Sequence, residues 1–133
     1  SNTITNFDYS NSLNAPFYGI KISAGAYSIG TKGGNIIGAT NGNNAIIYKA
    51  ATNNGNFYGM YLSTTDALNI QNNAIGAIKT DNADANLASH FTGIYRMSGS
   101  SNFINNTIRI LIQTSSQITN QKIINMVRVL MRD

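Results

Sequence analysis

The chain has 133 residues, of which 42% are hydrophobic and only 11% are charged, with a formal net charge of +4, no cysteine and no glutamate. This length predicts one domain with its own core, and the hydrophobic fraction excludes a disordered chain. The lack of cysteine excludes disulfides and thiolate chemistry. The basic residues form no stripe and no run of about 18 apolar residues occurs, so we expect neither a nucleic-acid partner nor membrane insertion.

A repeat runs through the chain. Its first phrase is Phe-Tyr-Gly-Ile at 17–20, Phe-Tyr-Gly-Met at 57–60 and Phe-Thr-Gly-Ile at 91–94. Its second phrase is Asn-x-Ile, which begins at Asn2, Asn35, Asn73 and Asn106, in steps of 33, 38 and 33 residues. A period of this length indicates a solenoid, a propeller or an array, because each unit buries its apolar face only against its neighbours.

The repeat predicts short β-strands in chain order. Apolar and polar residues alternate at 19–23 and 59–63, where Ile20 pairs with Ile22 and Met60 with Leu62 on one face. A second set of strands is expected at 35–37, 68–70, 74–78, 103–104 and 108–112, separated by segments rich in Asn, Gly and Ser. A propeller needs at least four repeats of about 40 residues, which is more than the 133 residues of this chain. We therefore expect an all-β chain folded as a parallel β-helix (β-solenoid), with 18 to 20 residues per coil and about six or seven coils.

The residues at 57–63, 70–76 and 90–95 resemble the repetitive right-handed parallel β-helix segments of very large secreted or cell-surface proteins of Bacteroidetes-type bacteria. The resemblance covers residues 1–108. It implies a bacterial extracellular or cell-surface location and a structural or adhesive role, with no catalytic residues and no cofactor to carry over.

The chain departs from this pattern after Ile108. Arg109 stands where the earlier copies have Gly38 and Gly76, and no glycine follows Gly99. We expect β-helix repeats over 1–112 and an atypical C-terminal cap or tail over 113–133, either as a helix or as further strands, because the end of a solenoid needs a covering unit.

Residues able to perform acid or metal chemistry are few. Asp81 and Asp84 lie close in sequence and resemble a calcium loop only loosely, so a weak calcium site is weighed against a solvated loop, which we favour. His90 has no second metal-ligand or catalytic partner nearby. We expect no catalytic residues and no bound metal.

Aromatic residues give the best candidate for a binding surface. Tyr61 and Tyr95, with Lys21 as their equivalent in the first repeat, are expected to point outward as a ligand-facing strip. The phenylalanines at 17, 57 and 91 lie either in the core, if the chain bends, or in an exposed column. We favour the core, because large aromatic side chains are normally buried.

The function predicted from these residues is structural or adhesive. The partner would be a carbohydrate or another surface protein, and unpaired strands at the ends would allow end-to-end self-association. A polysaccharide lyase or hydrolase on the same fold is the alternative, and it requires Asp66, Asp81 and Asp84 to converge in a groove. Binding to ice or crystal surfaces is a third reading, which requires a flat, regular threonine array.

Overall fold

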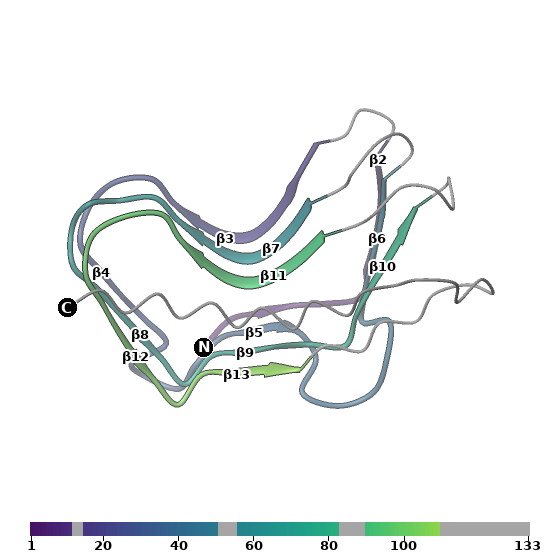
Figure 1. The fold of residues 1–133 in the computed structure, drawn as a ribbon. Coiled ribbons are helices and arrows are strands. Elements are labelled where there is room, and N and C mark those ends of the chain that lie inside the picture. Colours follow the sequence, from purple (N-terminus) through teal and green to yellow (C-terminus); the bar gives the residue numbers. More distant parts are fainter. Residues whose placement is uncertain (12–14, 51–55, 83–89, 110–133) are drawn as a thin grey trace.

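The computed structural model describes residues 1–11, 15–50, 56–82 and 90–109 (Figure 1). Every regular element in these ranges is a β-strand and every strand pair is parallel, which confirms the predicted all-β class. The described residues include no helix long and apolar enough to cross a membrane. The strands are β1 (Thr3–Ile4), β2 (Phe7–Asn11), β3 (Phe17–Ile22), β4 (Tyr27–Ile29), β5 (Ile36–Gly38), β6 (Ile46–Ala50), β7 (Asn56–Leu62), β8 (Leu68–Gln71), β9 (Ala74–Gly76), β10 (Ile78–Asn82), β11 (His90–Arg96), β12 (Ser101–Ile104) and β13 (Thr107–Arg109).

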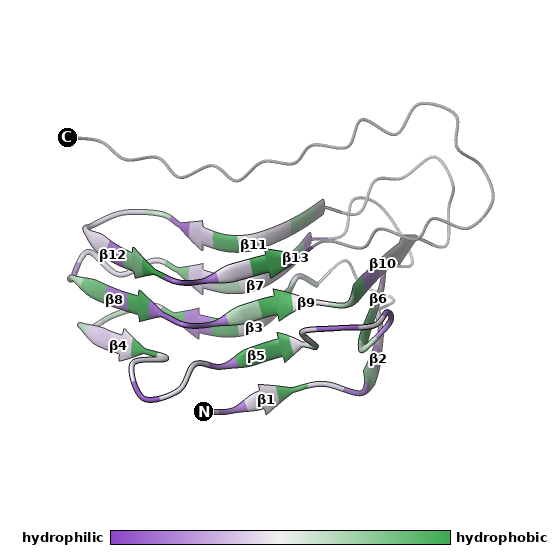
Figure 2. Ribbon diagram, turned by 90° about the horizontal axis from the view of Figure 1, so that it is seen from below, coloured by the Kyte–Doolittle hydropathy of each residue, from purple (hydrophilic) through white to green (hydrophobic). Residues whose placement is uncertain are grey.

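The strands form four parallel sheets, ordered β1-β5-β9-β13, β10-β6-β2, β11-β7-β3 and β12-β8-β4. The chain visits the sheets in the same order each time, and Figure 2 shows the strands of successive visits layered above one another. We call one pass through the four sheets a coil. The described residues contain three coils, β1–β4, β5–β8 and β9–β12, and the first strand of a fourth.

One coil takes up a whole repeat. The register aligns Thr3 with Ile36, Ile36 with Ala74, and Ala74 with Thr107, so 33 to 38 residues separate stacked positions. The described residues therefore do not contain the expected six or seven coils of 18 to 20 residues. The Asn-x-Ile strands and the Phe-containing strands belong to different sheets, so both phrases are needed to complete one coil.

The core consists of columns of inward side chains, one from each coil. The second coil has neighbours on both sides, and its inward residues are completely buried: Ile37, Ile46, Tyr48, Phe57, Met60, Leu62 and Ile70. The phenylalanine column lies inside, with ring centroids 4.8 Å apart between Phe17 and Phe57 and 5.4 Å apart between Phe57 and Phe91. This confirms the core position favoured for the repeated phenylalanines.

A bend at a recurring glycine explains how these phenylalanines reach the core. In β7, Phe57, Met60 and Leu62 are buried while Tyr58 and Tyr61 are half-exposed, so the alternation of faces is interrupted at Gly59. A Cβ atom at Gly59 would lie 2.5 Å from the Gly93 carbonyl oxygen and 2.8 Å from Ile75 Cδ1. The bend brings backbone and core together so closely that only glycine fits, and the three stacked strands bow toward the opposite sheet (Figure 1).

An asparagine ladder connects the coils at the start of each Asn-x-Ile strand. Asn35 and Asn73 are buried, and Asn73 Oδ1 accepts hydrogen bonds from the Asn35 backbone N–H (3.0 Å) and from Asn35 Nδ2 (2.9 Å). Asn106 Oδ1 accepts the equivalent pair from Asn73, and Asn35 Oδ1 the pair from Asn2. The ladder satisfies polar groups that the corner would otherwise bury without partners.

Several predictions fall outside the described residues. Asp84 lies in one of the undescribed ranges, as does the whole of the expected cap or tail at 113–133, and the side chain of Asp81, the other residue of the predicted calcium site, is also not described. The described part of the repeats ends at Arg109, before the predicted boundary at residue 112.

Candidate functional site

The outward face of sheet β11-β7-β3 carries a cluster that we call the tyrosine strip: Tyr18, Lys21, Tyr58, Tyr61 and Tyr95. The register aligns Tyr18 with Tyr58, and it places Tyr61 between Lys21 and Tyr95. The strip therefore consists of two parallel columns that run across the strands, one on each side of the glycine bend.

The tyrosine rings contact one another in both directions. Along the columns, the Tyr18 and Tyr58 rings are stacked with centroids 5.4 Å apart, and the Tyr61 and Tyr95 rings are stacked at 5.1 Å. Across the bend the rings meet edge to face, at 5.1 Å for Tyr18–Tyr61 and 5.2 Å for Tyr58–Tyr61. Each such pair stabilises the surface by about 0.5–1.5 kcal/mol, so the strip is preorganised.

Lys21 lies at the end of the strip in the first coil, where its ammonium group contacts two tyrosine rings. Its Nζ lies 4.9 Å from the centroid of the Tyr18 ring and 5.9 Å from that of Tyr61, within range of a cation–π interaction. At the other end, Tyr95 remains 38% exposed. The Tyr61 hydroxyl donates to Met97 Sδ at 3.9 Å.

The electrostatics of the strip suit contact rather than proton transfer. Burial raises the pKa of Tyr58, and the neighbouring Tyr18, Tyr61 and Tyr95 raise it further. The Tyr58 phenol is therefore neutral at physiological pH, and no strip residue is a carboxylate that could act as a base. The arrangement offers aromatic rings, phenolic hydroxyls and one ammonium group.

The structure brings together the three residues predicted as the strip, Lys21, Tyr61 and Tyr95. Sequence reasoning did not include Tyr18 and Tyr58, because strict alternation placed them on the opposite face from Tyr61. The glycine that recurs two residues after each phenylalanine is the sequence feature that indicates their outward position, because it interrupts the alternation of faces.

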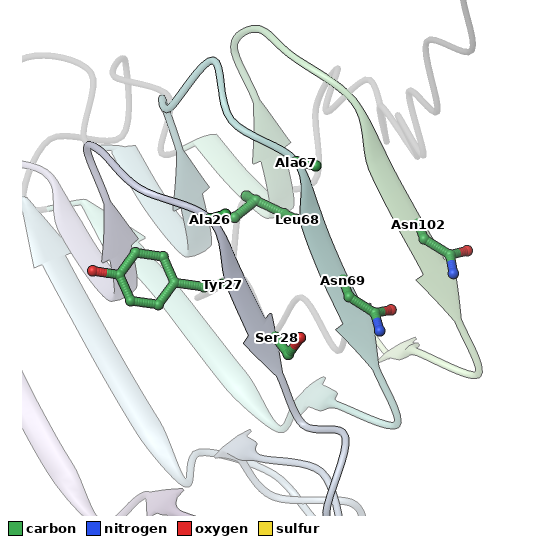
Figure 3. Close-up of a pocket in the computed structure, with 7 residues that line it drawn as sticks. All are labelled: Ala26, Tyr27, Ser28, Ala67, Leu68, Asn69 and Asn102. Atoms are coloured by element: carbon green, nitrogen blue, oxygen red, sulfur yellow. The ribbon is translucent and has the colours of Figure 1, made fainter.

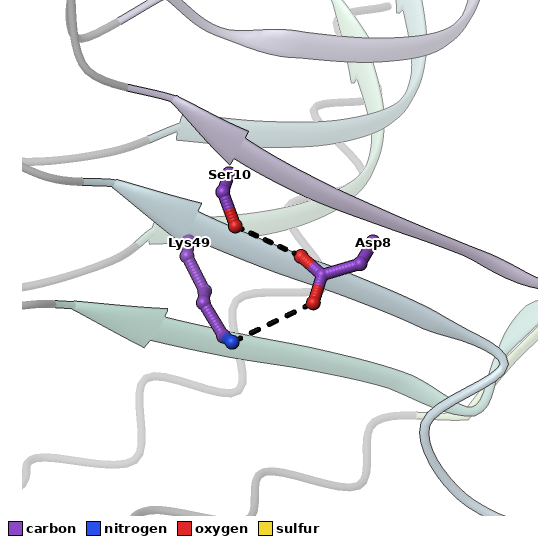
Figure 4. A network of polar contacts seen from close by, with 3 residues as sticks. All are labelled: Asp8, Ser10 and Lys49. Carbon is purple, nitrogen blue, oxygen red and sulfur yellow. Dashed lines mark hydrogen bonds and ion pairs between the residues drawn. The ribbon is translucent and has the colours of Figure 1, made fainter.

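The carboxylates occupy separate places. Asp8 Oδ2 lies 3.5 Å from Lys49 Nζ, and Asp8 Oδ1 accepts a hydrogen bond from the Ser10 hydroxyl at 3.0 Å (Figure 4). Asp81 lies on β10, where its backbone aligns with Lys49. No group of three or more potential metal-ligating side chains was found in the described part of the chain.

Asp66 lies in the connection between β7 and β8, where its carboxylate accepts hydrogen bonds that hold this connection in place. Its Oδ2 accepts hydrogen bonds from the Gly25 backbone N–H (3.0 Å) and the Thr64 hydroxyl (3.2 Å). This connection and β10 lie on opposite sides of the molecule (Figure 1). The structure therefore does not bring Asp66 and Asp81 together in the groove that the lyase or hydrolase reading requires.

A hollow lies over sheet β12-β8-β4, lined by Ala26, Tyr27, Ser28, Ala67, Leu68, Asn69 and Asn102 (Figure 3). Ser28, Asn69 and Asn102 are aligned on adjacent strands. Tyr27 is 51% exposed and lies outside the tyrosine strip. The lining contains no charged side chain.

The chain matches no family model, no curated protein and no solved structure. The resemblance to repetitive segments of bacterial surface proteins therefore stays a prediction.

Proposed function

We propose that this chain is a structural and adhesive module of a bacterial extracellular or cell-surface protein, built as a right-handed parallel β-helix and acting without catalysis. The right-handed sense follows from the general rule that crossover connections between parallel strands are right-handed. The stacked coils provide a stiff body, and one outer face provides the contact surface.

The tyrosine strip is the observation that carries the adhesive role. Its four tyrosines and Lys21 come from three coils, so the contact surface extends along the stack instead of forming a closed pocket. Aromatic side chains with a polar tip are favoured at binding surfaces, because they supply contact area at low cost in conformational entropy. Mutual ring contacts hold these side chains in place before any partner arrives.

A carbohydrate is the partner class that best fits this chemistry. Sugar rings present apolar C–H faces and hydroxyl groups, which match phenol rings and phenolic hydroxyls. The strip carries only one charge, that of Lys21, so the rings and phenolic hydroxyls supply most of its contact surface.

Binding to insoluble polysaccharides tests this proposal. We expect the protein to sediment with cellulose, chitin or xylan, and the double variant Tyr61→Ser and Tyr95→Ser to bind about tenfold more weakly, because two aromatic contacts are lost. The matched control is Tyr27→Ser, which removes an exposed tyrosine from a different sheet. Equal binding by the strip variant and the control would contradict the proposal, and retention only on a protein-coated surface would replace the carbohydrate with a protein partner.

A further inference from the structure

The two ends of the stack differ in the residues they present. In the first coil the inward side chains are all apolar and only half-buried, because they have a neighbouring coil on one side: Ile4, Phe7, Tyr9, Phe17, Ile20 and Ile22. Their counterparts in the second coil, among them Ile37, Phe57 and Leu62, are completely buried. The first coil thus exposes a surface equivalent to one that elsewhere in the molecule is covered.

The asparagine ladder also has an acceptor without donors at this end, within the described residues. Oδ1 of Asn35, Asn73 and Asn106 each accepts two hydrogen bonds from the preceding coil. Asn2 occupies the same position, but among the described residues its Oδ1 accepts none. Strands β1, β2, β3 and β4 each pair on one edge within the described ranges. As far as the described residues go, the strand edges of β1–β4, the Asn2 Oδ1 atom and the core columns all lack a neighbouring coil on the same side.

The opposite end keeps the apolar residues Phe91, Ile94 and Ile108 in the core columns, but it carries charged or polar residues at three other aligned positions. Arg96 aligns with Leu62 and Ile22, Ser101 aligns with Leu68, and Arg109 aligns with Gly76. Arg96 Nη2 donates to the backbone oxygens of Asp66 (2.9 Å) and Ser100 (3.1 Å), so the guanidinium is turned back against the corner. Arg109 Nη1 likewise donates to the Thr40 carbonyl oxygen at 3.0 Å.

Stacking a further coil of the same kind on this end would be energetically unfavourable. Arg96 Nε and Nη1 and Ser101 Oγ are already buried with no hydrogen-bond partner among the described residues, and burial lowers the pKa of Arg96. An aliphatic side chain stacked on Arg96, as Ile22 is stacked on Leu62, would bury a charge further without supplying an acceptor.

We infer that the face formed by β1–β4 is an interaction surface for another coil of this repeat, with Asn at the ladder position and no charged inward residue, and that the face with Arg96 and Arg109 is not. The surface continues the interface already present between the first and second coils. This inference rests on the proposed solenoid and is independent of the tyrosine strip.

Adding one coil at either end tests this polarity. In the first chain, residues 35–72 precede Asn2, so that Asn72 is followed by Asn2 as it naturally is by Asn73. In the second, residues 39–76 are inserted after Arg109. Each addition is one coil of the protein's own sequence. Unfolding temperature, amide hydrogen exchange and the near-ultraviolet circular dichroism of the tyrosines are measured for both and for the parent chain.

We expect the N-terminal addition to raise the unfolding temperature and to slow amide exchange in β1–β4, and to keep the tyrosine signal of the parent chain while the tyrosines of the added coil contribute to it. The C-terminal addition should give neither effect until Arg96→Leu and Arg109→Gly are introduced with it. Equal gains at both ends, no gain at the N-terminal end, or loss of the parent tyrosine signal in the first chain would overturn the inference. Head-to-tail association of the parent, seen as a mass that rises with concentration, would also overturn it. The polysaccharide assay on the parent chain tests the adhesive role separately.

Discussion

Replacing Gly38 with alanine is expected to lower the free energy of unfolding by about 2–5 kcal/mol. Gly38 has a φ of 86°, which costs an L-residue about 1–2 kcal/mol. A Cβ atom there would also overlap the carbonyl oxygen of Gly76, which is the aligned residue in the next coil. The two coils would have to separate, which adds about 1–3 kcal/mol in the manner of an overpacked core.

Gly42→Ala is the matched control. Gly42 has a φ of 80°, but no atom of the described residues lies within 4 Å of a Cβ atom placed on it. Chemical denaturation of both variants separates backbone strain from the contact between coils, and we expect Gly42→Ala to cost only the strain of about 1–2 kcal/mol. Equal losses for the two variants would mean that the coils do not approach as closely at Gly38 as the structure indicates.

Replacing Asn73 with alanine is expected to cost about 3 kcal/mol or more. Asn73 is 1% exposed, and its Oδ1 accepts hydrogen bonds from the backbone N–H and the Nδ2 of Asn35. Without Oδ1 these two donors remain buried with no acceptor, and each unsatisfied group costs about 1–3 kcal/mol. The Asn73 backbone N–H still donates to Asn106 Oδ1, whereas the hydrogen bonds from Asn73 Nδ2 to Asn106 Oδ1 and to the Ile29 carbonyl oxygen are lost as well.

Asn102→Ala provides the comparison for this variant. Asn102 is exposed on β12 and faces the hollow over sheet β12-β8-β4. We expect its loss to change the denaturation midpoint little, because surface substitutions of this kind usually cost less than about 0.5 kcal/mol. A similar, small effect for both asparagines would show that the ladder contributes little to stability.

The repeat made much of the fold predictable. Its Gly and Asn content and its period-two alternation indicated an all-β chain, and the recurrence of Phe17 and Phe57 placed equivalent positions beside one another. The length of a coil was not predictable from alternation, because alternation shows which face a side chain takes but not which sheet its strand joins. The strands around Ile36 and Phe57 were therefore assigned to successive coils, whereas they lie in different sheets of one coil.

The candidate site was predictable in part for a related reason. Lys21, Tyr61 and Tyr95 follow the glycine bend and keep a simple alternation with Ile22 and Leu62, so their outward position could be read from the sequence. Tyr18 and Tyr58 precede the bend, and their place in the strip depends on a backbone change at Gly19 and Gly59 that alternation does not describe. Such a change is set by the close approach of the neighbouring strand and of Ile37 and Ile75.

Engineered disulfides test most directly the central claim that one repeat makes one coil and that coils stack in register. The natural chain has no cysteine, so each pair can be introduced without background. Ser28 aligns with Asn69, and Asn69 with Asn102, on the outward face shown in Figure 3. Aligned residues on neighbouring parallel strands are about 4.8 Å apart, within the Cα separation of about 4.4–6.8 Å that a disulfide spans.

We predict that Ser28→Cys with Asn69→Cys, and Asn69→Cys with Asn102→Cys, each form an intramolecular disulfide under mild oxidation. Ser28→Cys with Asn102→Cys should remain reduced, because the strand of the second coil, which carries Asn69, lies between these residues. Mass spectrometry of the protein after digestion identifies the linked peptides. A disulfide in the third pair together with none in the first two would contradict the stacking of whole repeats.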